Sequence, residues 1–188
     1  MYSDSTNTDF GQPWSRCEEL IDTPPNGIAR TPDGKFSVRL SPHEKSVLAS
    51  LPGQAQALAT GGDPSTIRLF PPAYVEDTNA EAEYVTLMRG DLMDGCVEAL
   101  ETFRKTISSE TISEEEALQW LRAVNSIRLI IGTKINVQEG EQGPDPETVT
   151  AEDTRSQGML LYGYLTWLEQ ELIDAISESD GSNPSGGD

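Results

Sequence analysis

The sequence is poor in the residues that most often build metal sites and covalent frameworks. Its 188 residues include one histidine, His43, and two cysteines, Cys17 and Cys96. Two cysteines so far apart exclude a disulfide framework and any cysteine-rich zinc module. A zinc site needs three or four converging ligands, and no spacing of that kind occurs. We therefore predict that the chain holds no metal.

Catalytic and nucleotide-binding motifs are also missing. There is no glycine-rich phosphate loop, no dinucleotide fingerprint after a strand and no serine elbow. A catalytic triad would have to use His43 as its base, and no candidate nucleophile has a local signature. Carboxylates are so abundant that they do not distinguish a catalytic pair from a solvated charged face. We predict a non-enzymatic protein with no catalytic residue and no cofactor.

Long apolar runs and positive charge are scarce as well. No stretch approaches the roughly 18 apolar residues of a membrane span, and no basic-then-apolar leader opens the chain. Thirty-two acidic residues against 13 basic ones give a net charge of −19. A broad nucleic-acid-binding surface is excluded, because phosphate contacts need Lys and Arg. We expect a cytoplasmic protein that contacts neither membrane nor nucleic acid directly.

The negative charge is spread unevenly along the chain. Residues 28–135 carry fifteen acids and eleven bases, whereas residues 136–188 carry twelve acids against Arg155 alone. Segments dense in like charge and poor in apolar residues do not bury enough surface to fold. We predict a disordered acidic tail, a single helical domain with an acidic loop, and a second disordered tail. These segments are 1–26, 27–177 with the loop at about 138–152, and 178–188.

Periodicity predicts a short hairpin followed by helices. Phe36, Val38 and Leu40 alternate with polar residues after the Asp33-Gly34 turn. Because two strands alone are marginal in water, the hairpin must pack on helices. The fold class is mainly α, with a small N-terminal β-hairpin packed on a bundle of about four helices. The expected helices are 42–61 with a bend or break at Pro52-Gly53, 80–107, 114–135 at the centre, and 153–176. Capping-box patterns mark the first and third helix starts, with Ser41 before Glu44 and Ser113 before Glu116.

The expected helix at 80–107 carries one apolar stripe. The stripe recurs every three or four residues, the spacing of a single helix face. Gly90 and Gly95 lie within the same segment and reduce its helix propensity, which suggests close packing against a neighbouring helix. The stripe consists of Val85, Met88, Leu92, Cys96, Ala99, Phe103 and Ile107.

Arg128 is the most unusual residue of the expected central helix. It lies in register with the apolar residues Val124 and Ile131. An unpaired buried charge costs several kcal/mol, on the order of 3–5, so the guanidinium needs a partner. One explanation is an internal ion pair or carbonyl clamp, and the other is a ligand or partner site shared with Asn125. We hypothesise the structural role.

The two cysteines are the redox candidates. Cys96 lies on the apolar stripe, where cysteine is most often a small core residue. Cys17 stands beside Glu18 and Glu19, which disfavour the thiolate. Neither environment favours a tuned redox thiol.

Three segments resemble an actinobacterial domain family of unknown function. They are TIRLFPPAY at 66–74, WLRAVNSIRLIIGT at 120–133 and YGYLTWL at 162–168. The resemblance covers about residues 28–176. It implies a gene often found beside that of the proteolytic adaptor ClpS, and a family in which some members are described as oxidative-stress transcriptional regulators with closely spaced cysteines. This chain has no C-x-x-x-C pair. The motif residues Asn125, Arg128, Gly132 and Trp167 are similar to those of the family, with no catalytic role implied.

These observations favour a helical protein that works through protein–protein contacts, in a regulatory role linked to stress-responsive transcription. The acidic segments and the resemblance suggest a basic partner such as a sigma factor. A homodimer is also open, because aromatic residues such as Tyr162 and Trp167 suit an interface with a second subunit as well as they suit the core. The alternative is a small-molecule-binding or enzymatic domain with a pocket around Arg128 and Asn125. Asn125, Arg128 and Trp167 are the candidate structural or partner site.

Overall fold

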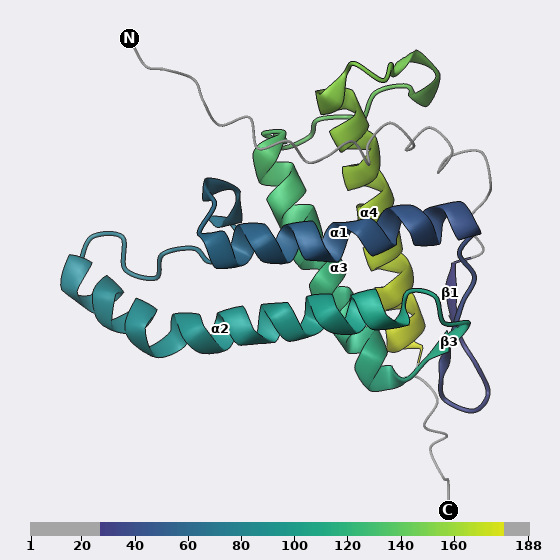
Figure 1. Ribbon diagram of the computed structural model, residues 1–188, viewed down its shortest axis with the longest axis horizontal. Coiled ribbons are helices and arrows are strands. Elements are labelled where there is room, and N and C mark those ends of the chain that lie inside the picture. Colours follow the sequence, from purple (N-terminus) through teal and green to yellow (C-terminus); the bar gives the residue numbers. More distant parts are fainter. Residues whose placement is uncertain (1–26, 179–188) are drawn as a thin grey trace, which may run out of the picture.

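A computed structural model of the chain describes residues 27–178. It consists of four long helices and a small antiparallel sheet at one end, which confirms the predicted fold class (Figure 1). The predicted tails lie outside the described residues, apart from Glu178. The elements are β1 (Ile28–Arg30), β2 (Phe36–Val38), α1 (Pro42–Gly61), α2 (Thr78–Thr106), β3 (Thr111–Ile112), α3 (Glu114–Lys134) and α4 (Thr154–Ser177), with short 3₁₀ turns η2 (Pro64–Thr66) and η3 (Pro146–Thr148).

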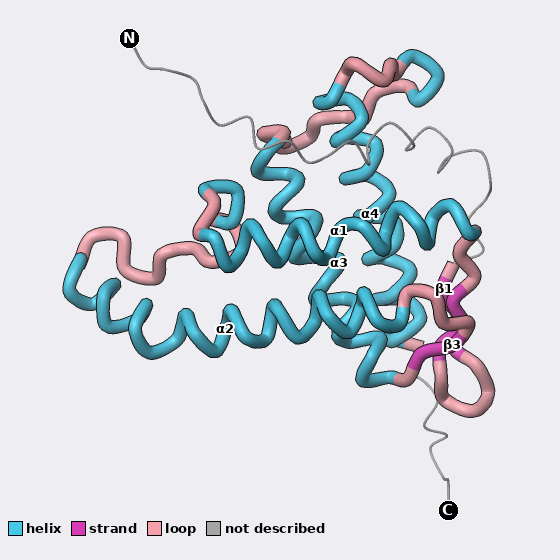
Figure 2. The backbone as a smooth tube through the Cα atoms, viewed as in Figure 1, coloured by secondary structure: helices cyan, strands magenta, loops and turns pink. Residues whose placement is uncertain are grey.

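The sheet has one more strand than the predicted hairpin. β1 and β2 pair antiparallel as expected, and β3 adds to the other side of β2 with Phe36 opposite Ile112. The three strands lie together at one end of the helices (Figure 2). β3 has only two residues, too few to show the alternation that identifies a strand in a sequence. It places Ile112 in the core and ties the connection between α2 and α3 to the hairpin.

Helix α1 is one continuous helix from Pro42 to Gly61, so the chain does not break at Pro52-Gly53. It begins with the predicted capping box of Ser41 and Glu44. Pro52 removes one backbone hydrogen bond, a cost that burial can offset. Leu51, Pro52 and Ala55 are all buried, so packing on both sides of the proline keeps the helix intact.

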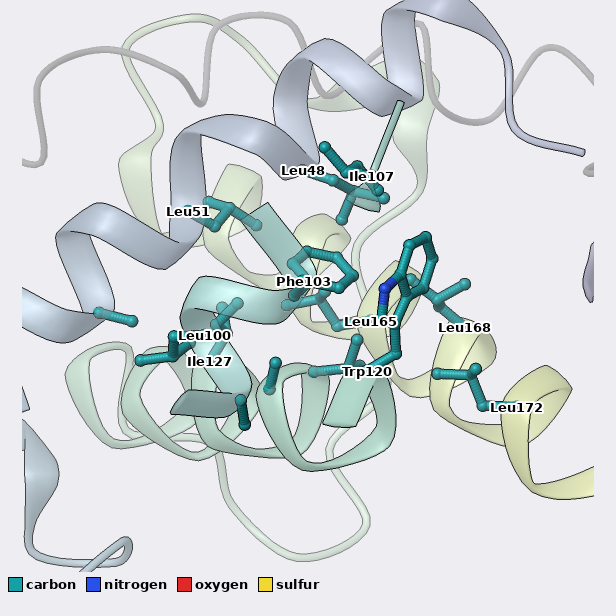
Figure 3. Close-up of a cluster of buried hydrophobic side chains, with 14 of the residues drawn as sticks. Leu48, Leu51, Leu100, Phe103, Ile107, Trp120, Ile127, Leu165, Leu168 and Leu172 are labelled. Atoms are coloured by element: carbon teal, nitrogen blue, oxygen red, sulfur yellow. The ribbon is translucent and has the colours of Figure 1, made fainter. Parts of the chain in front are cut away.

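The core surrounds α3, the predicted central helix, which packs against α1, α2, α4 and η2. Trp120 of α3 is fully buried against Phe103 of α2, with ring centroids 4.7 Å apart in an edge-to-face arrangement. The indole Nε1–H of Trp120 donates to Oγ1 of Thr106 over 2.7 Å. Leu165 and Leu168 of α4 close the core from the other side (Figure 3).

Close helix packing occurs at other glycines than those expected. A Cβ added at Gly90 or Gly95 of α2 would meet nothing within 4 Å, so these residues do not support helix packing. A Cβ at Gly132 of α3 would lie 2.9 Å from the Tyr162 ring, and one at Gly158 of α4 would lie 2.7 Å from Ile135. The close interface is therefore between α3 and α4.

The apolar stripe of α2 is only half covered. The buried residues of α2 are Cys96, Ala99, Leu100 and Phe103, all in the inner segment, residues 96–106. In the outer segment, residues 78–95, no residue is buried. Figure 1 shows the outer segment running past α3, away from α4 and the sheet. The predicted stripe is therefore buried only in the inner segment, since Met88 and Leu92 are exposed.

Candidate functional site

Arg128 is engaged in an ion pair between α3 and α4. Its Nη2 lies 3.0 Å from Oε2 of Glu169 and also donates to Oδ1 of Asn125 over 3.2 Å. The guanidinium stands 5.8 Å from the centre of the Tyr162 ring. The side chains of Arg128 and Glu169 are 23% and 14% exposed. The charge of Arg128 is thus neutralised by a partner on the neighbouring helix, a geometry that fits the structural role.

Trp167 does not belong to the Arg128 cluster. It follows Tyr162 by five residues on α4, which places the two side chains about 140° apart around the helix. Its ring instead faces that of Tyr164, with centroids 5.5 Å apart. Tyr162 and Trp167 are both partly buried against the core. Two of the three predicted site residues, Asn125 and Arg128, are therefore together, and the third is on another face of α4.

Among residues 27–178, the most buried charged residue is Glu44, which is 4% exposed. Its Oε2 accepts the backbone N–H of Ser41 over 2.6 Å, and its Oε1 accepts the hydroxyl of Tyr164 over 2.9 Å. Burial raises the pKa of Tyr164 far above its ordinary value, and the neighbouring Glu44 charge raises it further. Tyr164 therefore stays protonated and donates. The capping box indicated Glu44, whereas nothing in the sequence indicated its partner 120 residues away.

Cys96 lies in the interface of α2 and α3. Its Sγ is 3.8 Å from Oγ of Ser126, and burial raises the pKa of the thiol. A raised pKa disfavours the thiolate, which is the reactive form. The other redox candidate, Cys17, lies outside the described residues.

Neither a metal-binding cluster nor a membrane-spanning helix occurs among the described residues. Within the part of the chain that the structure describes, no three His, Cys, Asp or Glu side chains form a set that could hold a metal ion. Among residues 27–178, no helix combines the length and the apolar composition needed to cross a bilayer.

Exposed apolar side chains gather on the outer segment of α2 and the loop before it. Eight large hydrophobic side chains of the described residues are exposed, and six of them fall between residues 67 and 92. Such a concentration is typical of an interaction surface, whereas single exposed hydrophobic residues are normal. We call these six residues the outer patch. They are Ile67, Tyr74, Val75, Leu87, Met88 and Leu92.

An open groove of about 300 Å³ borders the outer patch. Ile67, Phe70 and Pro72 form its apolar wall, and Glu81 and Arg89 of α2 lie opposite. The guanidinium of Arg89 stands 5.9 Å from the centre of the Phe70 ring. This cation–π contact holds the loop against α2.

The loop between η2 and α2, residues 67–77, also contacts α2 at a second point. The carboxylate of Glu81 accepts the backbone N–H of Tyr74 over 2.8 Å, and the rings of Tyr74 and Tyr84 meet edge to face with centroids 6.2 Å apart. The groove is therefore formed jointly by the loop and the outer segment of α2. Sequence periodicity indicated Met88 and Leu92 as members of the apolar stripe but not the loop residues that join them here.

The fold is a helical domain with a small antiparallel sheet, and most of its exposed large hydrophobic side chains lie in the outer patch. A family model described as "Domain of unknown function (DUF2017)" matches residues 25–176. The chain belongs to this family. No curated protein and no solved structure matches the chain.

Proposed function

We propose that this chain is a non-enzymatic cytoplasmic protein that acts in a regulatory role by binding another protein. The observation that carries the proposal is the outer patch, in which six of the eight exposed large hydrophobic side chains lie on one projecting part of the fold. A concentration of exposed apolar side chains is costly in water and is typical of a surface that a partner covers. The link to stress-responsive transcription, the actinobacterial origin and the ClpS neighbourhood belong to this proposal and are supported only by the family resemblance.

The alternative, a ligand site at Arg128 and Asn125, has weaker support. A guanidinium that recruits a ligand needs free donors directed into a cavity. Arg128 already pairs with Glu169 at 3.0 Å and also donates to Asn125, and its Nε, which has no hydrogen-bond partner among the described residues, is buried and does not line the groove. The groove of about 300 Å³ is formed by other residues, on η2, the following loop and α2.

Direct nucleic-acid binding is likewise not part of the proposal. The N-terminal turn of α3, the part of a recognition helix that usually contacts bases, contains Glu114, Glu115 and Glu116. Three adjacent carboxylates at that end would repel phosphate.

Photocrosslinking in the native host tests the proposal. A photoreactive benzoylphenylalanine replaces one exposed apolar residue at a time, at positions 75, 87, 118 and 173. We expect a discrete adduct with another protein from at least one position, identified by mass spectrometry and abolished by competition with the untagged wild-type chain. If none of the four positions yields such an adduct, the proposal is contradicted.

A further inference from the structure

The two segments of α2 have the same sequence pattern and different surroundings. In the inner segment, Ala99 and Phe103 are fully buried against neighbouring helices. The same face continues through Leu92, Met88 and Val85 at helical spacing, but Leu92 and Met88 are 44% and 45% exposed. The elements that pack against α2 are two other helices, α3 and α1. The geometry of the missing partner is therefore that of a helix packed along α2.

The charge around the outer patch is strongly negative. Residues 63–98 carry eight carboxylates against Arg68 and Arg89, whereas the next stretch, residues 99–135, carries five acids and five bases. Asp91 and Glu98 are both exposed and lie seven residues apart, in one row beside Met88. An apolar stripe flanked by carboxylates is complementary to an apolar stripe flanked by Lys and Arg.

The chain's own segments do not supply that complement. Residues 1–26 carry five acids against Arg16, and residues 179–188 carry two acids and no base. A second copy would bring the same eight carboxylates against the patch. Like charges across an interface disfavour association, so the complementary occupant is a different, basic protein.

We propose that the outer patch and the adjoining groove bind a basic amphipathic helix of another protein, laid along the outer segment of α2. Apolar side chains of that helix at i, i+3 or i+4 and i+7 would contact Met88 and Leu92 and enter the groove beside Phe70. Its Lys and Arg residues would face Asp91 and Glu98. This inference rests on the proposed function and adds the location, the secondary structure and the charge of the partner.

A labelled model helix tests the surface in the purified full-length chain. The probe is a fluorescein-labelled 18-residue peptide of Leu and Lys with leucines on one helical face, and binding is measured by fluorescence anisotropy. A shuffled peptide of the same composition and a Leu/Glu counterpart serve as controls. We expect the Leu/Lys helix to bind at least about tenfold more tightly than either control, since both apolar register and positive charge are needed.

The matched variants decide where the probe binds. Met88→Ser/Leu92→Ser removes the apolar stripe, and Leu118→Ser/Ile173→Ser removes two similarly exposed residues elsewhere. Neither double variant changes the net charge. We expect the first to weaken binding about tenfold or more and the second less than about twofold. Circular dichroism and a melting curve confirm that both variants fold. Equal effects of the two pairs, or no effect of the first, would overturn the proposal.

Charge variants separate the docking surface from general attraction to an acidic chain. Asp91→Lys/Glu98→Lys and Glu139→Lys/Glu147→Lys change the net charge by the same amount at exposed positions. We expect the first pair to weaken probe binding at least about fivefold more than the second, because only the first lies beside the outer patch. Equal weakening by both pairs would mean that the probe binds through net charge alone, and would overturn the proposal.

Other occupants give distinct outcomes. If mass photometry shows a dimer that Met88→Ser/Leu92→Ser dissociates, the occupant is a second copy and the proposal is wrong. If the photoreactive residue at position 87 crosslinks to residues 1–26 of the same chain, the occupant is that segment and the proposal is wrong. In the host, we expect a basic partner to crosslink from positions 75 and 87. An adduct only from positions 118 or 173 would overturn the docking surface and leave the proposed function standing.

Discussion

The inner and outer segments of α2 belong to one helix, and they differ in nearly everything except sequence pattern. The inner segment packs Phe103 against Trp120. Its stripe residues, Cys96, Ala99 and Phe103, are all buried. The outer segment presents Met88 and Leu92 on the same face, where they are 45% and 44% exposed. An amphipathic sequence pattern therefore predicts that one face of a helix packs against another element. It does not predict whether that element belongs to the same chain.

We expect the stability of the fold and the binding of a partner to depend on different residues of α2. Residues that hold the bundle together are those of the inner segment and the interface of α3 and α4. Residues of the outer segment contribute little to the core, so a change there should affect binding and leave the fold intact.

The largest expected effect is the difference in the free energy of unfolding between two side-chain truncations on α2, Phe103→Ala and Leu92→Ala. Phe103→Ala deletes a fully buried ring and should lower the free energy of unfolding by about 3–5 kcal/mol. Leu92→Ala, at a position 44% exposed, should lower it by less than about 1 kcal/mol. Urea unfolding followed by circular dichroism measures both. Similar losses in the two variants would show that the outer segment is packed in solution, which contradicts the comparison.

A second contrast concerns ion pairs. Glu169→Gln leaves the half-buried Arg128 without its charge partner and should destabilise the fold by about 1–3 kcal/mol. The control is Glu101→Gln, which breaks the exposed pair with Lys105 and should cost less than about 0.5 kcal/mol. Chemical denaturation compares the two. If Glu169→Gln left stability unchanged, the structural role of Arg128 would be in error.

Replacing glycine by alanine should change the free energy of unfolding by a smaller amount, and in opposite directions at Gly95 and Gly132. Gly95→Ala adds a methyl group to open space and should stabilise the helix by about 0.5–1 kcal/mol. Gly132→Ala forces the Tyr162 ring to move and should destabilise the fold by about 1 kcal/mol or more. Thermal melts of both variants against wild type provide the measurement. A stabilising Gly132→Ala would show that α3 and α4 are not in close contact there.

The smallest effect concerns acid stability near the groove. Hydrogen bonds from Ser65 hold the pKa of Asp63 below its ordinary value. A lowered pKa in the folded state adds stability above the pKa of the unfolded chain, and this stability is lost as pH falls through the folded pKa. Between about pH 5 and pH 3, Asp63→Asn should therefore lose less stability than wild type, by on the order of a few tenths of a kcal/mol. Identical losses in urea titrations at the two pH values would contradict this assignment.

Local patterns predicted most of the fold. The capping boxes at Ser41 and Ser113 marked two helix starts, because their two hydrogen bonds join residues only three positions apart. The hairpin followed from alternation beside a turn. The third strand and the continuity of α1 through Pro52 did not, because both depend on contacts between residues distant in sequence.

The candidate site was less predictable than the fold. A charged residue on an apolar stripe indicated that Arg128 needs a partner, but Glu169 is 41 residues further along and one of many carboxylates. Of the outer patch, the sequence pattern indicated only Met88 and Leu92, as members of the apolar stripe, since such a pattern does not show where the neighbouring helix ends. Trp167 belongs to one of the three segments that resemble the family, and the structure places it away from Arg128.

Hydrogen exchange of the full-length chain, with and without the Leu/Lys helix, tests the central claim most directly. The free chain should exchange its amides at residues 82–95 far faster than those at residues 96–106, because little is packed on the outer segment. Saturating probe should slow exchange at residues 82–95 and leave the inner segment unchanged. Protection that appears only at the acidic loop, residues 138–152, or equal protection of both segments in the free chain, would contradict the account.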